Sequence, residues 1–425
     1  MQEQFRQKPI SVIPANYLNL DAFDRQRVSL PYPIYNDIPL YGQNESAWET
    51  VTNGVGSTST YNQSEPTISL TIGTASGAYV IRQQHHYNSY IPGKSQRVPV
   101  TWNFGEGVTD VKCVTRSNVS GSAIDTGISQ ADWNRDVIDG TGSSRLTADW
   151  SKFTIGVIDF QALYAGKQRF SIGIDGQTVL VHEIGNSNIL NVPYIGNANL
   201  PLRYEVRNTS SSVWVMRVGY FDDNNGMFFE ATGTISGNRT LKQLCSSCES
   251  EGGAVIQGFG FSASNGATLR TGITTRTPIF AIRQKQTFRN DTTSTAKTNR
   301  RKAKLLQGGI YVTGADCFIE IVHNHDPSSV TGTWSDVHMN SSSCEKSTDI
   351  TAITAAAAHV IFSDYVTTSQ GNKGLAHDIS FDIDDYHLVI ANEYSGLISE
   401  TFVVYVTSLG GAASAGVALR WIEYD

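Results

Sequence analysis

The chain has 425 residues, enough for about two or three domains whose cores need no disulfide staples. Only 17% of its residues are charged and its formal net charge is −7, so the composition excludes a general electrostatic attraction to nucleic acid. The sequence contains no run of about 18 apolar residues and no signal-peptide core, so we expect a soluble protein released by lysis or assembly, without membrane contact.

The first 60 residues predict an extended N-terminal arm. Prolines are dense in this stretch, and each one removes a backbone donor and disfavours both a helix and a central strand. They are Pro9, Pro14, Pro31, Pro33 and Pro39. An arm of this kind buries little surface by itself, so we expect it to lie on another surface, either its own or that of a partner.

From residue 61 onward the sequence alternates between apolar and polar residues. In "TISLTIGTASGAYVIRQQHHY" the apolar positions are Ile68, Leu70 and Ile72, and the turn at 73–77 predicts a strand–turn–strand unit. Further short runs, such as "RVPVTWNF", "FTIGVIDFQAL" and "LPLRYEVRN", are separated by turn residues. We therefore predict an all-β fold, with a jelly-roll-like antiparallel β-sandwich over residues 61–280.

Two tight hairpins are predicted within this domain, at the turn residues Asp175-Gly176 and Asn225-Gly226. The first hairpin contains His182-Glu183, which begins like a zinc-protease motif. The second motif histidine is replaced by Asn186, so a strand with structural side chains is favoured. The one helix we expect starts near residue 240, in "TLKQLCSSCESEGG".

Residues 281–425 repeat the same pattern and predict a second, C-terminal β-sandwich domain. The only dense basic run, "KTNRRKAK" at 297–304, lies near the boundary between the two domains. It lacks the interleaved aromatic residues of a single-strand binding surface, so we interpret it as an exposed loop or a contact with an acidic neighbour, not as a nucleic-acid site.

Metal-ligating residue types occur, but in weak patterns. His323, His325 and Asp326 form the best cluster, although two histidines at a strand end are more often a polar loop edge than a metal site. Cys245 and Cys248 form a single CxxC without a second pair, and the sequence leaves open whether they bind metal or pair with each other. We favour reduced thiols and predict no metal and no cofactor.

The sequence contains no G-x-S-x-G motif, no phosphate loop and no glycine-rich dinucleotide turn, so we predict no catalytic residues and no enzyme activity. An alternative function is recognition of host-surface carbohydrate. Trp133, Trp334 and Tyr365 are candidates for stacking on sugar rings. A third hypothesis is a glycan depolymerase, in which paired carboxylates would cleave the sugar chain.

Six longer phrases resemble a widespread family of virion structural proteins from tailed bacteriophages and some large algal viruses. They are "DAFDRQRVSLPYPIYN" (21–36), "YIPGKSQ" (90–96), "RSNVSGSAIDTGISQADWNRDVIDGTGSSRLTADWSK" (116–152), "IDGQTVLVHE" (174–183), "LPLRYEVRNT" (200–209) and "TLKQLCSSCESEGG" (240–253). The resemblance spans about residues 20–265 and carries no catalytic residues with it.

This resemblance implies a particle component that assembles in the host cytoplasm with other virion structural proteins. Tail or baseplate, head-fibre and capsid-decoration positions are all open, and so is the strand order around residues 100–230. We expect a homo-oligomer of trimeric or higher order, because sandwich domains of such particles join through their exposed edges and faces.

Overall fold

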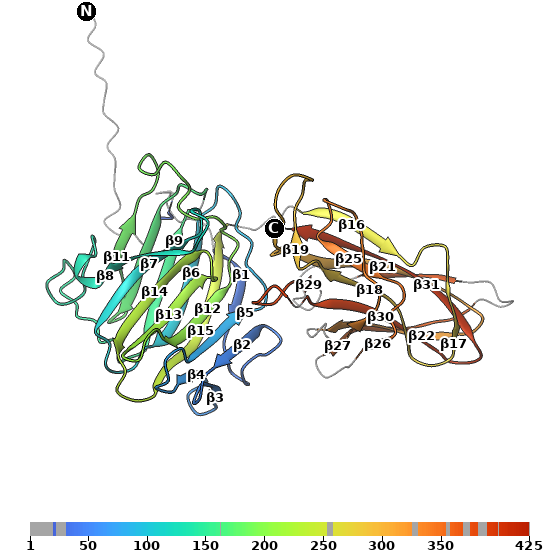
Figure 1. Ribbon diagram of the computed structural model, residues 1–425, viewed down its shortest axis with the longest axis horizontal. Coiled ribbons are helices and arrows are strands. Elements are labelled where there is room, and N and C mark those ends of the chain that lie inside the picture. Colours follow the sequence, from blue (N-terminus) through green and yellow to red (C-terminus); the bar gives the residue numbers. More distant parts are fainter. Residues whose placement is uncertain are drawn as a thin grey trace, which may run out of the picture. The chain divides into compact units, whose positions relative to one another are not determined.

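The structure is a computed structural model of the 425-residue chain (Figure 1). It describes residues 20–22, 31–161, 163–252, 258–324, 330–353, 358–368, 375–380, 389–397 and 399–424. These residues form β-strands, turns and one 3-10 turn at Gln130–Asp132, and no α-helix occurs among them, which confirms the predicted all-β class.

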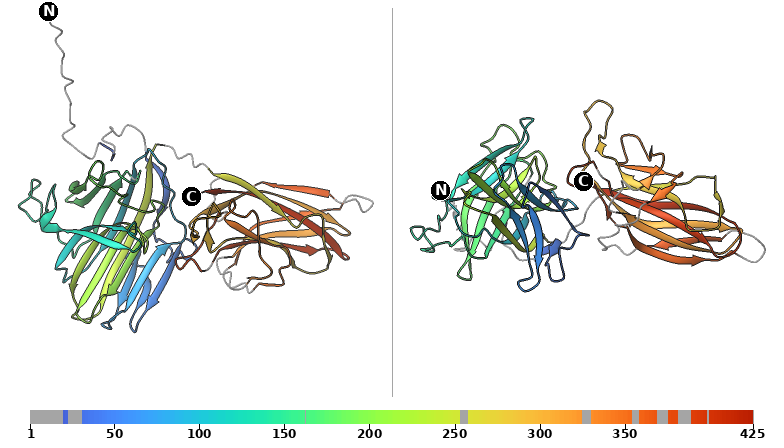
Figure 2. Two further views of the ribbon diagram at one scale, coloured as in Figure 1. Left: turned by 45° about the horizontal axis from the view of Figure 1, so that its top comes forward. Right: turned by 60° about the horizontal axis from the view of Figure 1, so that its bottom comes forward.

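The described residues fall into two compact units. The first takes the residues within 1–42, 52–81 and 90–254, and the second takes those within 43–51, 82–89 and 255–425. Figure 2 shows each unit as layered sheets, with most of the first unit coloured blue to green and most of the second yellow to red.

Two antiparallel sheets build the first unit. The strands of one sheet are, in spatial order, β11 (Gln177–Ile184), β10 (Gln168–Ile174), β9 (Thr154–Phe160), β6 (Gln96–Asn103), β15 (Arg239–Glu251), β4 (Thr67–Ile72) and β3 (Thr58–Asn62), with β1 (Pro31–Asp37) also paired to β15. The strands of the other are β2 (Trp48–Asn53), β5 (Tyr79–Gln84), β12 (Leu202–Asn208), β13 (Val213–Phe221), β14 (Gly226–Thr234), β7 (Asp110–Ser117) and β8 (Ile124–Ser129). Residues 48–51 of β2 and 82–84 of β5 belong to this sheet, although they are grouped with the second unit.

The core of this sandwich lies between the two sheets and is rich in aromatic side chains. Trp102 of β6 packs against Phe229 of β14 with ring centroids 5.1 Å apart, and Phe170 of β10 meets the same ring edge-on at 5.5 Å. Gly156 of β9 lies beneath Trp102, where an added Cβ would come within 2.3 Å of the indole. Alternate burial along β6 reflects the period-two pattern of its sequence.

The two predicted hairpins are present. In the first, β10 pairs with β11 through Ile174 and Gln177, and the turn residues Asp175 and Gly176 have φ values of 49° and 72°. In the second, β13 pairs with β14, and within the connecting turn the Asp222 carboxylate accepts hydrogen bonds from the backbone N–H groups of Asn224 and Asn225. The Asp-Gly dipeptide suits the first turn because both of its residues tolerate positive φ.

The helix predicted near residue 240 is wrong, because this segment is strand β15. Its buried positions alternate, with Leu241, Gln243, Ser246, Cys248 and Ser250 all facing inward. Small Ser and Cys side chains fit a crowded central strand that pairs with β6 on one edge and with β4 and β1 on the other. Tertiary packing therefore overrides the helix signal that the Gly-Gly sequence suggested.

The predicted strand–turn–strand unit at 67–84 is present as β4 and β5, but its two strands lie in different sheets. β4 pairs with β3 and β15 in one sheet, whereas β5 lies between β2 and β12 in the other. The chain continues to cross between the sheets from β5 to β6 and from β6 to β7. Such alternation is typical of jelly-roll-like sandwiches, in which neighbouring strands along the chain belong to opposite layers.

The predicted domain boundaries need correction at both ends of the first sandwich. Residues 31–62 contain three sheet strands, so they are not an irregular arm; β1 tolerates its prolines because it is an edge strand paired only to β15. Residues 1–19 and 23–30 of the predicted arm lie outside the described residues. The first unit ends at residue 254, not at 280, since the strands from residue 259 onward belong to the sheets of the second unit.

The second unit is also a sandwich of antiparallel sheets. One sheet contains β16 (Phe259–Ser264), β31 (Ala413–Tyr424), β21 (Lys302–Thr313) and β28 (Leu375–Ser380), with β17 (Arg270–Ile273) paired to β31 and β29 (Val389–Ile390) to β21. The other contains β24 (Ser335–Asp336), β25 (Cys344–Ser347), β18 (Thr277–Gln284), β30 (Thr401–Ser408), β22 (Cys317–Asn324) and β27 (Ala358–Val366). Short pairs are formed by β19 (Thr287–Phe288) with β20 (Lys297–Thr298) and by β23 (Val330–Thr331) with β26 (Ala352–Ile353).

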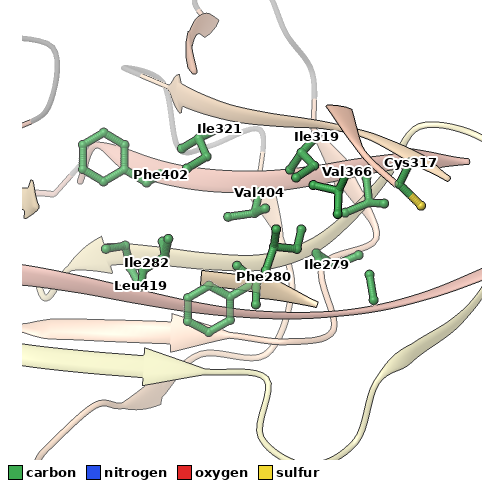
Figure 3. Close-up of a cluster of buried hydrophobic side chains, with 14 of the residues drawn as sticks. Ile279, Phe280, Ile282, Cys317, Ile319, Ile321, Val366, Phe402, Val404 and Leu419 are labelled. Atoms are coloured by element: carbon green, nitrogen blue, oxygen red, sulfur yellow. The ribbon is translucent and has the colours of Figure 1, made fainter. Parts of the chain in front are cut away.

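Aliphatic side chains dominate the core of the second unit. Figure 3 shows Phe280 and Ile282 of β18 beside Val404 of β30, and Leu419 of β31 comes from the opposite sheet. These four residues are buried completely. The predicted C-terminal β-sandwich is therefore present, with a core made within its own unit.

Candidate functional site

A pocket of about 560 Å³ opens on the first unit. Its lining residues come from β7, β8, the start of β10, the end of β11 and the segment that follows β11. They are Thr115, Ser117, Val119, Ser120, Ile124, Thr126, Gln168, Ile184, Gly185, Asn186, Ile189, Leu190, Val192, Pro193 and Tyr194. None of these side chains carries a charge, and we call this site the apolar pocket.

Five aliphatic side chains of the apolar pocket are exposed to solvent. The exposed fractions are 37% for Val119, 55% for Ile124, 73% for Ile189, 48% for Leu190 and 54% for Val192. Single exposed apolar residues are ordinary on a protein surface, but several gathered around one hollow are typical of an interaction site.

The segment 185–194 is held in place by polar contacts at both of its ends. The Asn186 side-chain amide donates to the Gly166 carbonyl at 2.7 Å, and the Tyr194 N–H donates to the Tyr164 carbonyl at 3.1 Å. Burial raises the pKa of the Tyr194 phenol above its usual range, so this ring stays neutral. The fixed ends let the aliphatic residues between them project from the loop instead of entering the sandwich core.

One polar atom in the pocket lining has no partner among the described residues. Gln168 is fully buried, and its Oε1 accepts a hydrogen bond from the Thr115 hydroxyl at 2.6 Å. Its amide nitrogen Nε2 finds no acceptor in the described part of the chain. A buried donor without an acceptor costs about 1–3 kcal/mol, so a bound group with an acceptor oxygen would gain by filling this position.

The three aromatic residues predicted to stack on sugars have very different surroundings. Trp133 is buried, donates a hydrogen bond from its indole N–H to the Ile128 carbonyl at 3.1 Å and packs edge-on against Trp150. These contacts stabilise the surrounding loop, so Trp133 has a structural role. The face of Trp334 is covered by the Arg283 guanidinium, 4.1 Å from the ring centroid.

Tyr365 is the third of these residues and is 64% exposed. Its ring lies beside Phe318, with centroids 5.0 Å apart. Tyr365 is therefore the one of the three that presents an aromatic surface to solvent, on the edge strand β27.

The predicted metal cluster is described only in part. His323 is buried on β22, and its Nε2 lies 3.5 Å from the Glu400 carboxylate. His325 and Asp326 lie outside the described residues. Within the described ranges, no group of three or more His, Cys, Asp and Glu side chains could hold a metal ion.

The two cysteines of the CxxC motif lie on strand β15, and the His182-Glu183 pair lies on strand β11. Cys248 is buried and accepts a hydrogen bond from the Gln96 amide at 2.8 Å, whereas Cys245 is half-buried. Both are free thiols. His182 Nδ1 accepts from the Asn134 N–H, and Glu183 pairs with Arg169 at 2.9 Å, which fits the structural roles expected of the pair.

Sequence reasoning missed a network of charges on the seven-stranded sheet of the first unit. Glu205 of β12 is fully buried, with Arg203 Nη2 at 2.5 Å and Arg217 Nη1 at 3.2 Å from its carboxylate. Arg217 also pairs with Glu230, and Arg116 pairs with Asp125 at 2.7 Å. Alternating charges within "LRYEVR" were the available signal, but they do not show which strands supply the partners.

The apolar pocket was missed as well. Its signal was an Ile-Leu-x-Val run inside the Asn- and Gly-rich segment "GNSNILNVPY", where aliphatic residues are unexpected. The proximity of this segment to Ile124 depends on pairing between distant strands, and the sequence does not reveal that pairing.

The chain matches no family model and no curated protein. Among solved structures, a β-glucanase from Bacillus licheniformis has 9% identity and a TM-score of 0.16, and the match covers 52% of this chain and 98% of that one. The N-terminal CBM22-1-CBM22-2 tandem domain of Xyn10C from Paenibacillus barcinonensis has 8% identity and a TM-score of 0.21, covering 93% and 98%. The Emp46p carbohydrate recognition domain, in its potassium-bound form, has 10% identity and a TM-score of 0.18, covering 51% and 96%.

At such scores these likenesses assign no activity, ligand or partner to this chain. No helix in the described part of the chain is both long enough and apolar enough to span a membrane.

Proposed function

We propose that this chain is a non-enzymatic structural protein of a virus particle and that the apolar pocket is where it joins a neighbouring protein. The apolar pocket is the single observation that carries the proposal. It combines exposed aliphatic side chains with a buried, unsatisfied amide donor and no charged lining residue. The resemblance of six phrases to tailed-phage virion proteins supports the kind of assembly.

The chemistry of the apolar pocket suits a polypeptide better than a sugar or a reacting substrate. Aliphatic side chains gain about 25 cal/mol for each Å² of apolar surface removed from water, whereas sugars are bound by aromatic faces and dense hydrogen bonding. Acid–base or nucleophilic catalysis needs ionisable groups, and the pocket lining offers only the Tyr194 phenol. The placement in the particle would be tail or baseplate, head-fibre or capsid decoration.

The proposal is tested by Leu190→Asp, which places a charge in the apolar pocket. Val55→Asp is the matched control, because Val55 is 89% exposed and lies outside the pocket lining. Particles are produced in cells supplying either variant, and the protein per particle is measured by quantitative mass spectrometry. We expect Leu190→Asp to lower incorporation at least about tenfold, since burying a leucine stabilises a contact by about 1.5–3 kcal/mol. Equal incorporation of the two variants would refute the proposal.

Tyr365 favours a second candidate function, recognition of host-surface glycan. Its ring is exposed and lies against Phe318, an arrangement that holds an aromatic face ready for a sugar ring. The test is a glycan array with the intact protein and with Tyr365→Ala, together with a depolymerisation assay on host polysaccharide. Binding that disappears in Tyr365→Ala supports this candidate, and release of oligosaccharides would point to a depolymerase. If no glycan on the array binds the intact protein, this candidate function is refuted.

A further inference from the structure

We propose that the apolar pocket binds residues 9–14 of a second copy of this chain. The inference rests on the proposed function, because it names the neighbour that occupies the same site. The segment is Pro9-Ile10-Ser11-Val12-Ile13-Pro14, and it belongs to the residues outside the described part of the chain.

The apolar pocket specifies the chemistry of its occupant. Its rim is aliphatic, so the occupant needs aliphatic side chains, and the Gln168 Nε2 donor needs an acceptor oxygen inside the pocket. A polypeptide supplies both, because every residue carries a backbone carbonyl. Salt bridges are not part of this recognition, since the pocket lining has no charged side chain.

Residues 9–14 meet these requirements. Ile10, Val12 and Ile13 are aliphatic, and the segment contains no charged residue. Pro9 and Pro14 lack an N–H, so they leave fewer donors to satisfy in an apolar site. A proline also biases the residue before it toward an extended backbone, in which successive side chains point to opposite sides.

Residues 20–22, the described part of the predicted arm, are anchored at the end of strand β10 that also borders the apolar pocket. The Arg169 side chain donates to the Asp21 carbonyl at 2.6 Å, and the Ala22 N–H donates to the Ser95 hydroxyl at 3.1 Å. Arg169 directly follows Gln168 on strand β10, so the two side chains point to opposite faces of the sheet. The anchor at residues 20–22 and the apolar pocket therefore share one end of this strand but not one face. Six residue steps separate Pro14 from Leu20, a reach of about 20 Å.

This geometry suits reciprocal exchange between two copies. Because the anchor at residues 20–22 and the apolar pocket lie at the same end of strand β10, a two-fold axis near that end would bring the anchor of one copy within reach of the pocket of the other. Each copy then donates one arm and receives one, as a closed symmetric interface requires. Exchange of an identical segment makes the same contacts in either copy, so the symmetric pair needs no additional binding surface.

A cross-linking experiment tests the exchange in the full-length protein. Ile13→Cys and Leu190→Cys are placed in separate proteins, which are mixed and oxidised, and the covalent products are identified by mass spectrometry. We expect a disulfide between position 13 of one copy and position 190 of the other. Val55→Cys in place of Leu190→Cys is the matched control and should cross-link at least about tenfold less. A chain that carries both substitutions is oxidised in parallel. If the link forms only within that chain and not between the separate proteins, the arm fills its own pocket and the inference is overturned.

A second measurement covers the case in which the introduced cysteines disturb folding. A fluorescent peptide of residues 5–16 is titrated into the full chain carrying Ile10→Asp, Val12→Asp and Ile13→Asp, whose own arm cannot compete. We expect saturable binding that Leu190→Asp weakens at least about tenfold and Val55→Asp leaves unchanged. Absence of binding overturns the inference.

The two proposals fail in distinguishable ways. If Leu190→Asp lowers incorporation into particles while neither peptide binding nor cross-linking between copies occurs, the apolar pocket serves another virion protein and the proposed function stands. If cross-linking occurs but incorporation is unaffected, self-association stands and the proposed role in the particle fails.

Discussion

Glu205 shows at the scale of single residues what holds the first sandwich together. Burial alone would raise the pKa of its carboxyl group, but the guanidinium groups of Arg203, Arg207 and Arg217 lower it to about 2. The sequence predicted the strand that contains Glu205, yet it could not predict the partner Arg217, which comes from the neighbouring strand β13. Charge pairing across strands depends on register, and register is set by the whole sheet.

We predict that Glu205→Gln lowers the free energy of unfolding by about 3 kcal/mol, because it leaves buried guanidinium groups without their carboxylate. The folded pKa is below the ordinary value of 4.5, so this carboxylate stabilises the fold above pH 4.5 and loses that effect as the pH falls toward 2. Denaturant unfolding from pH 7 to pH 2 measures both effects. Glu65→Gln, at an exposed pair with Lys242, is the control and should change stability little.

Cys245 gives a second test at the scale of residues. Partial burial, and then the Asp37 carboxylate, raise the pKa of its thiol, while the other four cysteines are buried. We expect Cys245 to be the fastest thiol to react with a disulfide reagent at mildly alkaline pH, and Cys245→Ser to abolish that phase while Cys248→Ser preserves it. If Cys245 and Cys248 react equally slowly and the protein contains bound zinc or a disulfide between them, the half-buried free thiol that strand β15 gives Cys245 is contradicted.

At the scale of elements, the sequence was informative where structure is local. The β10–β11 and β13–β14 hairpins were predicted because their turn residues and their pairing partners are adjacent in the chain. Strand β15 was predicted as a helix because its central position, between β6 on one edge and β4 and β1 on the other, comes from residues far away in the sequence. For the same reason, the sequence predicted β4 and β5 as a strand–turn–strand unit but did not show that these strands lie in opposite sheets.

The turn of the first hairpin provides a prediction at this scale. Gly176 has a φ of 72°, a conformation that costs a residue with a Cβ about 1 kcal/mol. We therefore expect Gly176→Ala to lower the free energy of unfolding by about 1 kcal/mol, whereas Asp175→Asn, which also tolerates positive φ, changes it little. Thermal unfolding measures both variants, and an unchanged Gly176→Ala would show that the turn has another geometry.

At the scale of the whole molecule, the chain consists of two units with separate cores. The chain length predicted more than one domain, and the strand pattern predicted sandwiches on both sides of the boundary. The boundary itself was misplaced because the first strands of the second unit, at 259–284, have the same alternating pattern as the strands before them. Only pairing with β31 and β30 assigns these strands to the second unit.

Separate cores predict two thermal transitions in calorimetry. Leu70 of β4 is buried in the first unit and Leu419 of β31 in the second. Replacing either with alanine leaves a cavity and removes about 3 kcal/mol of stability. We expect Leu70→Ala to lower one midpoint and Leu419→Ala to lower the other. A single transition that moves with both variants would contradict two cores that unfold separately.

The central claim is that the apolar pocket at the end of the first sandwich joins this protein to its neighbours in a virus particle. A cryo-EM reconstruction of the intact particle, at a resolution that shows side chains, tests it most directly. The account predicts backbone density from another chain against Leu190, with a carbonyl oxygen within hydrogen-bonding distance of Gln168 Nε2. A pocket open to solvent in every copy, or a particle without this protein, would contradict it.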